Sequence, residues 1–142
     1  MPLEWTAEQV FGFLAREFPQ ALRPDVDYRI VELEPERTLV RVSVGEAQLR
    51  PGGTVSGPVI MELVDFAVYF LLLAHHREKA KLSVTTGLTI SFLRKPAPGA
   101  LLADARFIKH GRTLTVARVD IRSEGSDALV ASSEATYYTG NI

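Results

Sequence analysis

The segment Ser56–His76, SGPVIMELVDFAVYFLLLAHH, decides the fold of this chain. From Val59 to Ala74 nearly every residue is apolar, on all sides of a helical wheel. A helix that is apolar all round is buried, so we expect the rest of the chain to wrap around it. The segment is too short and too acidic to predict a membrane span, which needs about 20 apolar residues.

Two carboxylates, Glu62 and Asp65, interrupt this apolar segment. Because they are three residues apart, they share roughly one face of the helix, and Tyr69 lies one turn further along. Acidic side chains are almost never fully buried without a partner or a function. The helix is therefore a candidate site as well as the core element.

The composition is that of an ordinary globular protein. The 142 residues predict a single domain, 1–142, with enough length to bury a core. The net charge of −1 argues against nucleic acid as a partner. No Cys is present, which excludes disulfides, thiolate metal sites and a cysteine nucleophile. The N-terminal residues show no signal-peptide pattern, so we expect a cytoplasmic protein that does not bind a membrane.

Short elements precede the central helix. Thr6 is placed as the N-cap of an amphipathic helix, with Gln9 completing a capping box. Strands are predicted at 28–33 and 37–45, the second with alternating valines. The sequence RPGGT at 50–54 predicts a turn that leads to the central helix.

Four strands follow the helix, at residues 82–93, 101–109, 113–123 and 128–138. Short turns join the last three, which predicts an antiparallel meander. The fold class is therefore α+β: a strongly curved antiparallel sheet of five to six strands wrapped around a long central helix (about 58–76), plus a short N-terminal helix. One sheet covers only part of a helix that is apolar all round, so we expect a homodimer.

Several motifs, in this order, resemble the hotdog-fold thioesterases, in particular their PaaI-like (phenylacetic acid degradation) branch. The resemblance rests on SGPVIMELVD at 56–65, TTGLTISFLRKP at 85–96 and ASSEATY at 131–137. The family pattern is His-Gly-Gly, an apolar run and an Asp in the second turn of the central helix, then a strand resembling T-x-D-L-x-I-x-Y-L-R-P. It implies the hotdog fold for this chain.

The chain departs from the family pattern at four positions. Ser56 stands where the family has His, and Pro58 where it has a second Gly. Arg50 takes the place of an Asn often found in the preceding loop, and Gly87 takes the place of an Asp. Any catalytic role that the resemblance implies therefore has to rest on positions at which this chain matches the family pattern.

The spacing from Gly57 to Asp65 is one of the features that are kept. The first N–H groups of a helix can hydrogen-bond the oxyanion of a reacting thioester, which suits Gly57. The resemblance implies that Asp65 of the other subunit attacks the thioester or activates water there. Thr85 could orient that water or the carboxylate through its hydroxyl.

Three further residues near the helix start are candidates for substrate contacts. Ser56 could partly replace the missing His, although it could equally be a helix cap. Pro58 suits the first helical position, where its absent N–H is not missed. Glu62 is either a pocket-rim residue or a first-turn acid favoured by the helix dipole.

Cations in or beside turns could hold coenzyme A. Arg50, Arg94 and Lys95 are placed to meet its phosphates, although exposed turn cations are usually just solvated. Coenzyme A is part of the substrate, so no separate cofactor is expected. No metal is expected either, because the adjacent His75 and His76 diverge on a helix.

Simpler explanations remain open for each catalytic candidate. Gly57 could only mark the helix start, Asp65 could be a buried acid satisfied by backbone or Tyr contacts, and Thr85 could be an ordinary strand residue. The favoured function is an acyl-CoA thioesterase that hydrolyses an acyl or aryl thioester as a homodimer or a dimer of dimers. The alternative is a non-catalytic hotdog protein that binds acyl-CoA or a small aromatic ligand. A hotdog hydratase ranks last, because those sites resemble a His paired with an acid.

Overall fold

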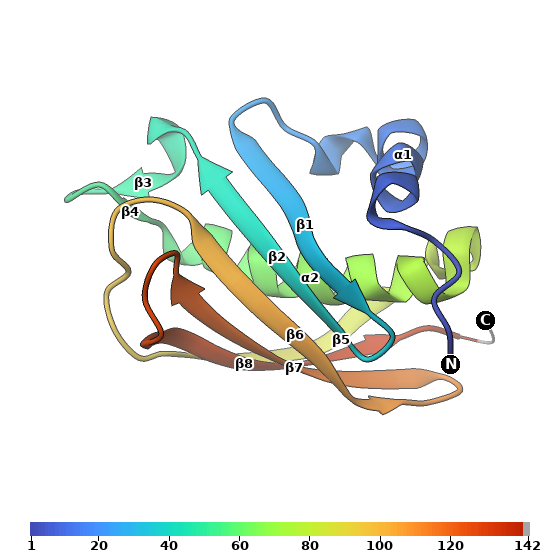
Figure 1. Cartoon of the computed structure of the whole chain (residues 1–142). Coiled ribbons are helices and arrows are strands. Elements are labelled where there is room, and N and C mark those ends of the chain that lie inside the picture. The colour runs from blue at the N-terminus through green and yellow to red at the C-terminus, as the bar shows by residue number, and fades with distance from the viewer. Residues whose placement is uncertain (141–142) are drawn as a thin grey trace.

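Helix α2 (Gly57–His76) lies at the centre of the molecule in the computed structural model, which describes residues 1–140 (Figure 1). A 3₁₀ turn, η3 (Arg77–Ala80), continues it. Every residue from 67 to 75 is buried, so this half of the helix is covered on all sides. The predicted wrapped helix at 58–76 is confirmed, with one residue added at its start.

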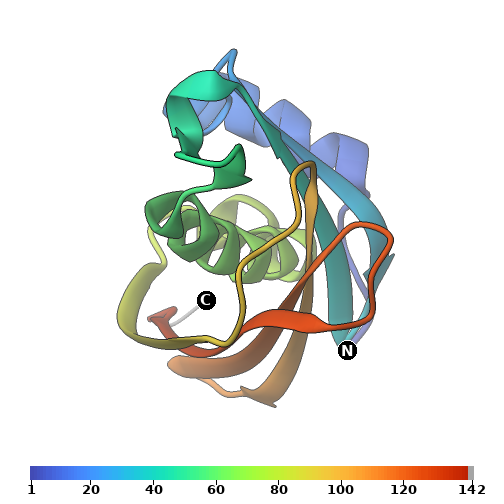
Figure 2. The ribbon, with the colours of Figure 1, turned by 90° about the vertical axis from the view of Figure 1, so that its left-hand side faces the viewer.

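One six-stranded antiparallel sheet curls around α2 (Figures 1 and 2). Its order is β1-β2-β6-β7-β8-β5, so β1 and β5 are the edge strands. The strands are β1 (Val26–Glu34), β2 (Arg37–Val44), β5 (Val84–Phe92), β6 (Leu101–His110), β7 (Leu114–Ser123) and β8 (Leu129–Tyr138). The predicted α+β hotdog fold, with a meander at its end, is confirmed.

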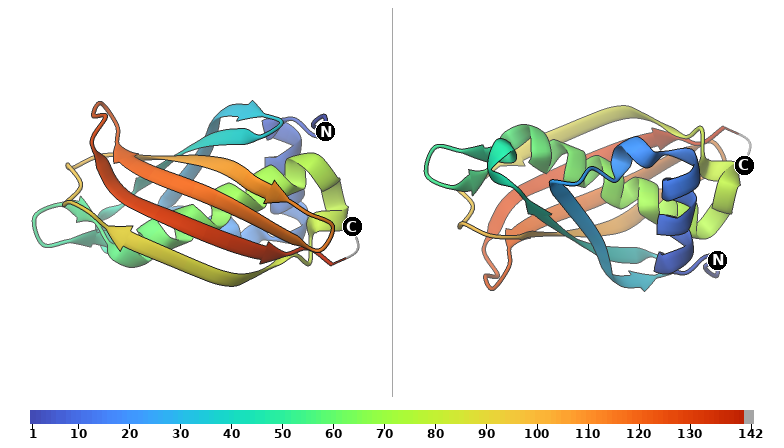
Figure 3. Two further views of the ribbon diagram at one scale, coloured as in Figure 1. Left: turned by 90° about the horizontal axis from the view of Figure 1, so that it is seen from below. Right: turned by 90° about the horizontal axis from the view of Figure 1, so that it is seen from above.

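Smaller elements complete the fold. α1 (Ala7–Glu17) begins with the predicted capping box and lies on the side of α2 opposite the β6-β7-β8 meander (Figure 3). The predicted turn at 50–54 is a small hairpin, in which β3 (Leu49–Arg50) pairs with β4 (Thr54–Val55). This hairpin holds the chain beside the first turn of α2.

By length and mean hydropathy alone, the segment Gly57–Ala80 would be able to cross a membrane, so the length argument made from the sequence was wrong. The structure gives a different account of its apolar character. Of its most apolar 18-residue window, 67% is buried inside the protein. Burial of this extent is typical of a core helix.

The first half of α2 leaves one stripe of the helix uncovered. From the second residue onward, the unburied positions in this half are Pro58, Met61, Glu62, Asp65 and Phe66. Their spacing of three and four residues places them along one face. The neighbouring edge strand β5 exposes the large apolar side chains of Val84 and Phe92. Together they form an apolar surface of the kind that subunit interfaces cover.

Candidate active site

Asp65 lies where α2, β5 and β8 meet. Its Oδ1 accepts a hydrogen bond from the Thr85 hydroxyl and another, of 2.8 Å, from the Tyr137 hydroxyl. The Tyr137 hydroxyl is also 3.0 Å from the backbone carbonyl oxygen of Asp65. No hydrogen bond involves Oδ2 within residues 1–140. The carboxylate is thus held by one oxygen and open at the other.

The register of the sheet brings these two hydroxyls together. Thr85 and Tyr137 are direct partners in the ladder between β5 and β8, and the register shifts by one residue between Thr85 and Gly87. A bulge of this kind re-aims side chains locally and is common beside active sites. Gly87, which stands where the family has Asp, lies on the other side of that bulge.

The surroundings of Tyr137 keep its hydroxyl protonated, so that it can donate a hydrogen bond. Burial, and then the negative charge of Asp65, raise the pKa of the Tyr137 phenol far above its ordinary value. The phenol therefore stays protonated throughout the working pH range and can only donate to the carboxylate.

Asp65 is accessible from two adjoining hollows. One, of about 420 Å³, is lined by aromatic side chains, with Phe18, Phe66 and Tyr69 around Asp65. The other, of about 380 Å³, lies over the uncovered stripe of α2, between Met61 and β5. Tyr69 does not bond the acid, because its hydroxyl donates to the backbone carbonyl of Lys81 at 3.0 Å. The other charged residues that line the larger hollow, Glu17 and Lys81, form an ion pair of 3.4 Å with each other. A largely apolar hollow of this kind could hold an acyl group beside Asp65 as a base.

Glu62 differs from its predicted role as a first-turn acid, because it lies in the second turn. Its Oε1 accepts hydrogen bonds from Arg23 at 2.8 Å and from the Tyr28 hydroxyl at 2.6 Å. Burial, and then the bond to Glu62, raise the pKa of Tyr28 strongly. Glu62 also lines the smaller hollow beside Asp65, so its placement at a pocket rim agrees with the second of its two predicted roles.

The start of α2 faces a different hollow. Gly57 is the first helical residue and Pro58 the second, one position later than predicted for the proline. Neither backbone nor side-chain bonds engage the Gly57 N–H within the part of the chain described. Ser56 occupies the N-cap position, but its side chain makes no capping hydrogen bond. A Cβ on Gly57 would lie 3.8 Å from the Phe92 ring, so the helix start is next to the far end of β5.

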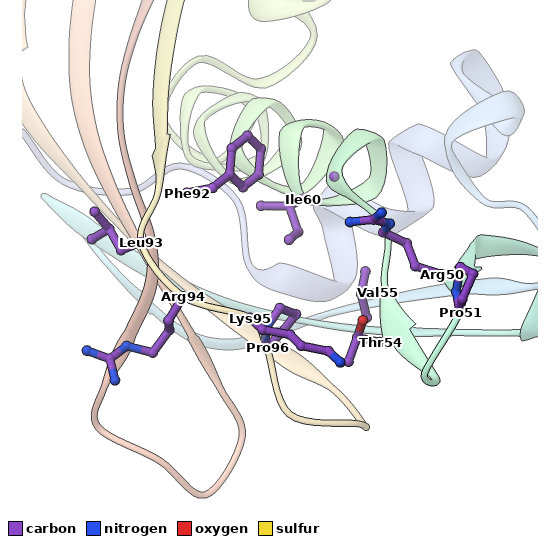
Figure 4. A pocket seen from close by; sticks show the side chains of 11 residues that line it. Arg50, Pro51, Thr54, Val55, Ile60, Phe92, Leu93, Arg94, Lys95 and Pro96 are labelled. Atoms are coloured by element: carbon purple, nitrogen blue, oxygen red, sulfur yellow. The ribbon is translucent and has the colours of Figure 1, made fainter.

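This second site is a hollow of about 700 Å³ at the N-terminus of α2 (Figure 4). Arg50, Arg94 and Lys95, the three cations that the sequence suggested for coenzyme A phosphates, all line this hollow. They are not equivalent. The Arg94 side chain extends away from the other two, and its Nε donates to the Leu129 carbonyl at 2.8 Å. Arg50 and Lys95 remain as the cations best placed to meet an anion at the helix start.

Within one chain, Asp65 and Gly57 do not form a common site. They are eight residues apart, or about 12 Å along the helix axis. Different hollows contain them, with Thr85 beside the acid and Phe92 beside the glycine. Each copy of the chain thus carries two half-sites at opposite ends of the uncovered stripe.

Sequence reasoning missed Tyr137 as part of the site. The signal was available in part, because alternation along β8 places every second residue from Ala131 to Tyr137 inward. What was not available is the pairing of β8 with β5, which sets Tyr137 opposite Thr85.

Two of the three histidines are in contact, which the sequence did not predict. His76 and His110 meet with their Nε2 atoms 2.7 Å apart, although 34 residues separate them in the sequence. No group of three His, Asp or Glu side chains with a geometry that would hold a metal ion occurs within residues 1–140.

The curved sheet around one long helix, with an acid in that helix and an open N–H at its start, defines the hotdog class of thioester-processing proteins. Comparison of sequences gives the family. Residues 52–130 match the family model of the thioesterase superfamily. Because the match covers more than half of the chain, this protein belongs to the thioesterase superfamily.

Individual relatives agree with this family. One relative of known structure is a protein from Silicibacter sp. TM1040 that is provisionally assigned as a thioesterase. Its sequence is 42% identical to this chain, and the structural match covers 97% of this chain and 94% of that chain, with a TM-score of 0.87. Acyl-coenzyme A thioesterase 13 of Mus musculus is 27% identical over 112 residues, which cover 79% of each protein. A variant of the phenylacetic acid degradation protein PaaI from Thermus thermophilus is 21% identical, covers 89% of this chain and 97% of that one, has a TM-score of 0.66 and shares the fold. The predicted relationship to the hotdog thioesterases is confirmed, and the family supports thioester hydrolysis as the general activity.

Proposed function

We propose that the protein is an acyl-CoA thioesterase that works as a homodimer or a dimer of dimers. In this proposal Asp65 is the base or nucleophile, and the Gly57 N–H of the partner subunit is the oxyanion donor. The observation that carries the proposal is the Asp65 carboxylate, held by two hydroxyls on one oxygen and open at the other, on the wall of an apolar hollow. The cytoplasmic location stays a prediction.

A two-fold axis through one part of the surface would join the two half-sites. In this arrangement the two copies of α2 run antiparallel, and Asp65 of one copy lies opposite Gly57 of the other. Met61 is midway between residues 57 and 65 along the helix, so it would lie on the axis. On β5, Thr85 is beside the acid and Phe92 is beside the glycine, and the halfway point is at Leu88–Thr89. Met61 and Leu88 line the same hollow, which supports a single position for the proposed axis on both helix and strand.

The cations support coenzyme A as the thiol part of the substrate. Arg50 and Lys95 line the hollow at the helix start, and neither makes an ion pair within residues 1–140. The substrate's phosphates would meet them while the thioester carbonyl reaches the Gly57 N–H. The acyl group would then enter the aromatic hollow beside the partner's Asp65. The hollow leaves open whether an alkyl or an aryl group is preferred.

Hydrolysis in this geometry uses one water molecule. In the general-base route, Asp65 takes a proton from water, and the water oxygen bonds to the thioester carbon. The carbonyl electrons move to the oxygen, where the N–H at the helix start stabilises the oxyanion. The C–S bond then breaks, and the thiolate takes the proton back from Asp65. In the nucleophilic route, Asp65 attacks the carbonyl carbon, the C–S bond breaks and a mixed anhydride forms with release of the thiolate. Water then hydrolyses the anhydride, which frees the acid and Asp65, and a proton of that water reaches the thiolate.

The test is Asp65→Asn, assayed with a panel of acyl-CoA esters and a thiol-reactive dye. We expect kcat to fall at least about 10²-fold while the dimer stays folded. Glu134→Gln, an exposed acid on β8, is the matched control and should keep its activity. Full activity in purified Asp65→Ala would refute the assignment. Saturable acyl-CoA binding without thiol release by the wild-type protein would instead favour the non-catalytic binder, which the departures at Ser56, Pro58 and Arg50 also fit.

A further inference from the structure

Tyr137 is the least expected residue around the acid. It comes from β8, 72 residues after Asp65, and it is buried. Its ring stacks on Tyr69, with the ring centroids 6.3 Å apart, so packing fixes the direction of its hydroxyl. That hydroxyl is within hydrogen-bond distance of both Oδ1 and the backbone carbonyl of Asp65. One side chain thus contacts the acid and the helix turn that carries it.

We infer that Tyr137 is a positioning residue which, together with Thr85, holds Oδ1 of Asp65 and so assigns Oδ2 as the oxygen that reacts. This inference rests on the proposed function. A carboxylate oxygen offers two acceptor sites, and the two hydroxyls occupy both sites on Oδ1. The remaining lone pairs of the carboxylate are on Oδ2, which has no partner within residues 1–140. Only that oxygen can take a proton from water or attack a carbonyl carbon without breaking a bond first.

The two donors also determine how the acid behaves. A donor to a carboxylate favours its ionised form, which is the form that a base or a nucleophile needs. The two donors also restrict rotation of the carboxylate, so Oδ2 stays directed at the hollow. Since misplacement by about 1 Å can cost about 10²-fold in rate, the loss of one donor should reduce kcat more than it changes KM.

The variant that tests this is Tyr137→Phe, which keeps the stacked ring and removes the hydroxyl. Tyr138→Phe is the matched control, because it removes an exposed tyrosine hydroxyl from the next residue of β8, which lines neither hollow beside Asp65. In Tyr137→Phe we expect kcat to fall about 10- to 100-fold with KM nearly unchanged. Tyr138→Phe should keep the wild-type kcat and KM.

A readout that does not need turnover separates this inference from the proposed function. Crystal structures of wild type, Tyr137→Phe and Tyr138→Phe show how the Asp65 carboxylate is oriented in each protein. A carboxylate that turns away from its wild-type orientation in Tyr137→Phe, and not in Tyr138→Phe, supports the inference even if no thioester is hydrolysed. An unchanged orientation together with an unchanged kcat in folded Tyr137→Phe would overturn it, while wild-type turnover that requires Asp65 would leave the proposed function intact.

Discussion

The proposed dimer makes its sharpest prediction at Met61, which lies midway between the two half-sites. Met61 is 45% exposed, although it belongs to an otherwise mostly buried helix. On a two-fold axis this side chain meets its own copy. Met61→Glu keeps the length of the side chain and the helix propensity but places two carboxylates face to face. We expect this variant to be a folded monomer without thioesterase activity.

The size of the effect follows from burial and charge. Complete burial of a Met side chain is worth about 1.5–3 kcal/mol, so the exposed part contributes roughly 1 kcal/mol per copy and about 2 kcal/mol per dimer. Two like charges about 6 Å apart repel by about 3 kcal/mol at an effective dielectric constant of about 20. The sum of about 5 kcal/mol corresponds to a dissociation constant of the dimer that is raised by more than about 10³-fold. The new charge beside Asp65 costs only a few tenths of a kcal/mol within the helix.

Analytical ultracentrifugation over a concentration series measures this change, and the thiol-reactive dye measures activity at the same concentrations. Ile108→Glu is the matched control, because Ile108 is 58% exposed but lies on β6, away from the stripe and from β5. It should remain dimeric and active. A Met61→Glu protein that still forms a tight dimer would refute the placement of the axis. A monomer with wild-type kcat would refute the shared site.

Two further predictions concern charge. Arg50→Ala and Lys95→Ala should each raise KM for acyl-CoA up to about fivefold with little change in kcat, whereas Arg94→Ala should do less, because its guanidinium already bonds the Leu129 carbonyl. The increase in KM should vanish with a short thioester that lacks the nucleotide of coenzyme A. Equal increases in KM with both substrates would contradict the assignment of Arg50 and Lys95 as phosphate-binding residues. Burial, followed by the neighbouring histidines, lowers the pKa of His110 from 6.5 to about 4. Between pH 4 and pH 6.5, the unfolded chain therefore binds more protons than the folded chain. Because His110 is partly exposed, solvent screening reduces the effect, and urea unfolding should show a stability loss of about 1 kcal/mol from pH 7 to pH 5 that His110→Gln reduces.

The sequence predicted the fold well because its strongest signals are local. The apolar run of α2, the capping box at Thr6 and the alternation along the strands are each visible within a few residues. Strand ends differed from the prediction by only one or two residues for most strands, because hairpin turns leave little freedom there. The hairpin at 49–55 was missed, since strands of two residues have no periodicity to detect.

The site was harder to predict because its contacts are not local. Asp65, Thr85 and Gly57 could be named from motif spacing, and the cations could be named from their turns. The bond from Tyr137 to Asp65 depends on the β5–β8 register and on a bulge, neither of which a single sequence specifies. Glu62 was placed near a pocket rim, but its partners Arg23 and Tyr28 lie more than 30 residues away.

The position of Asp65 along α2 explains why an acid is tolerated in this helix at all. From residue 67 to residue 75 every position is buried, and a carboxylate there would lose water on all sides. One turn before Asp65, at Met61, the side chain is 45% exposed. Asp65 lies at the boundary, where β5 and β8 supply two donors to one oxygen and the uncovered stripe leaves the other accessible. The incomplete cover of α2 is thus the feature from which both the proposed subunit interface and the proposed reactive acid follow.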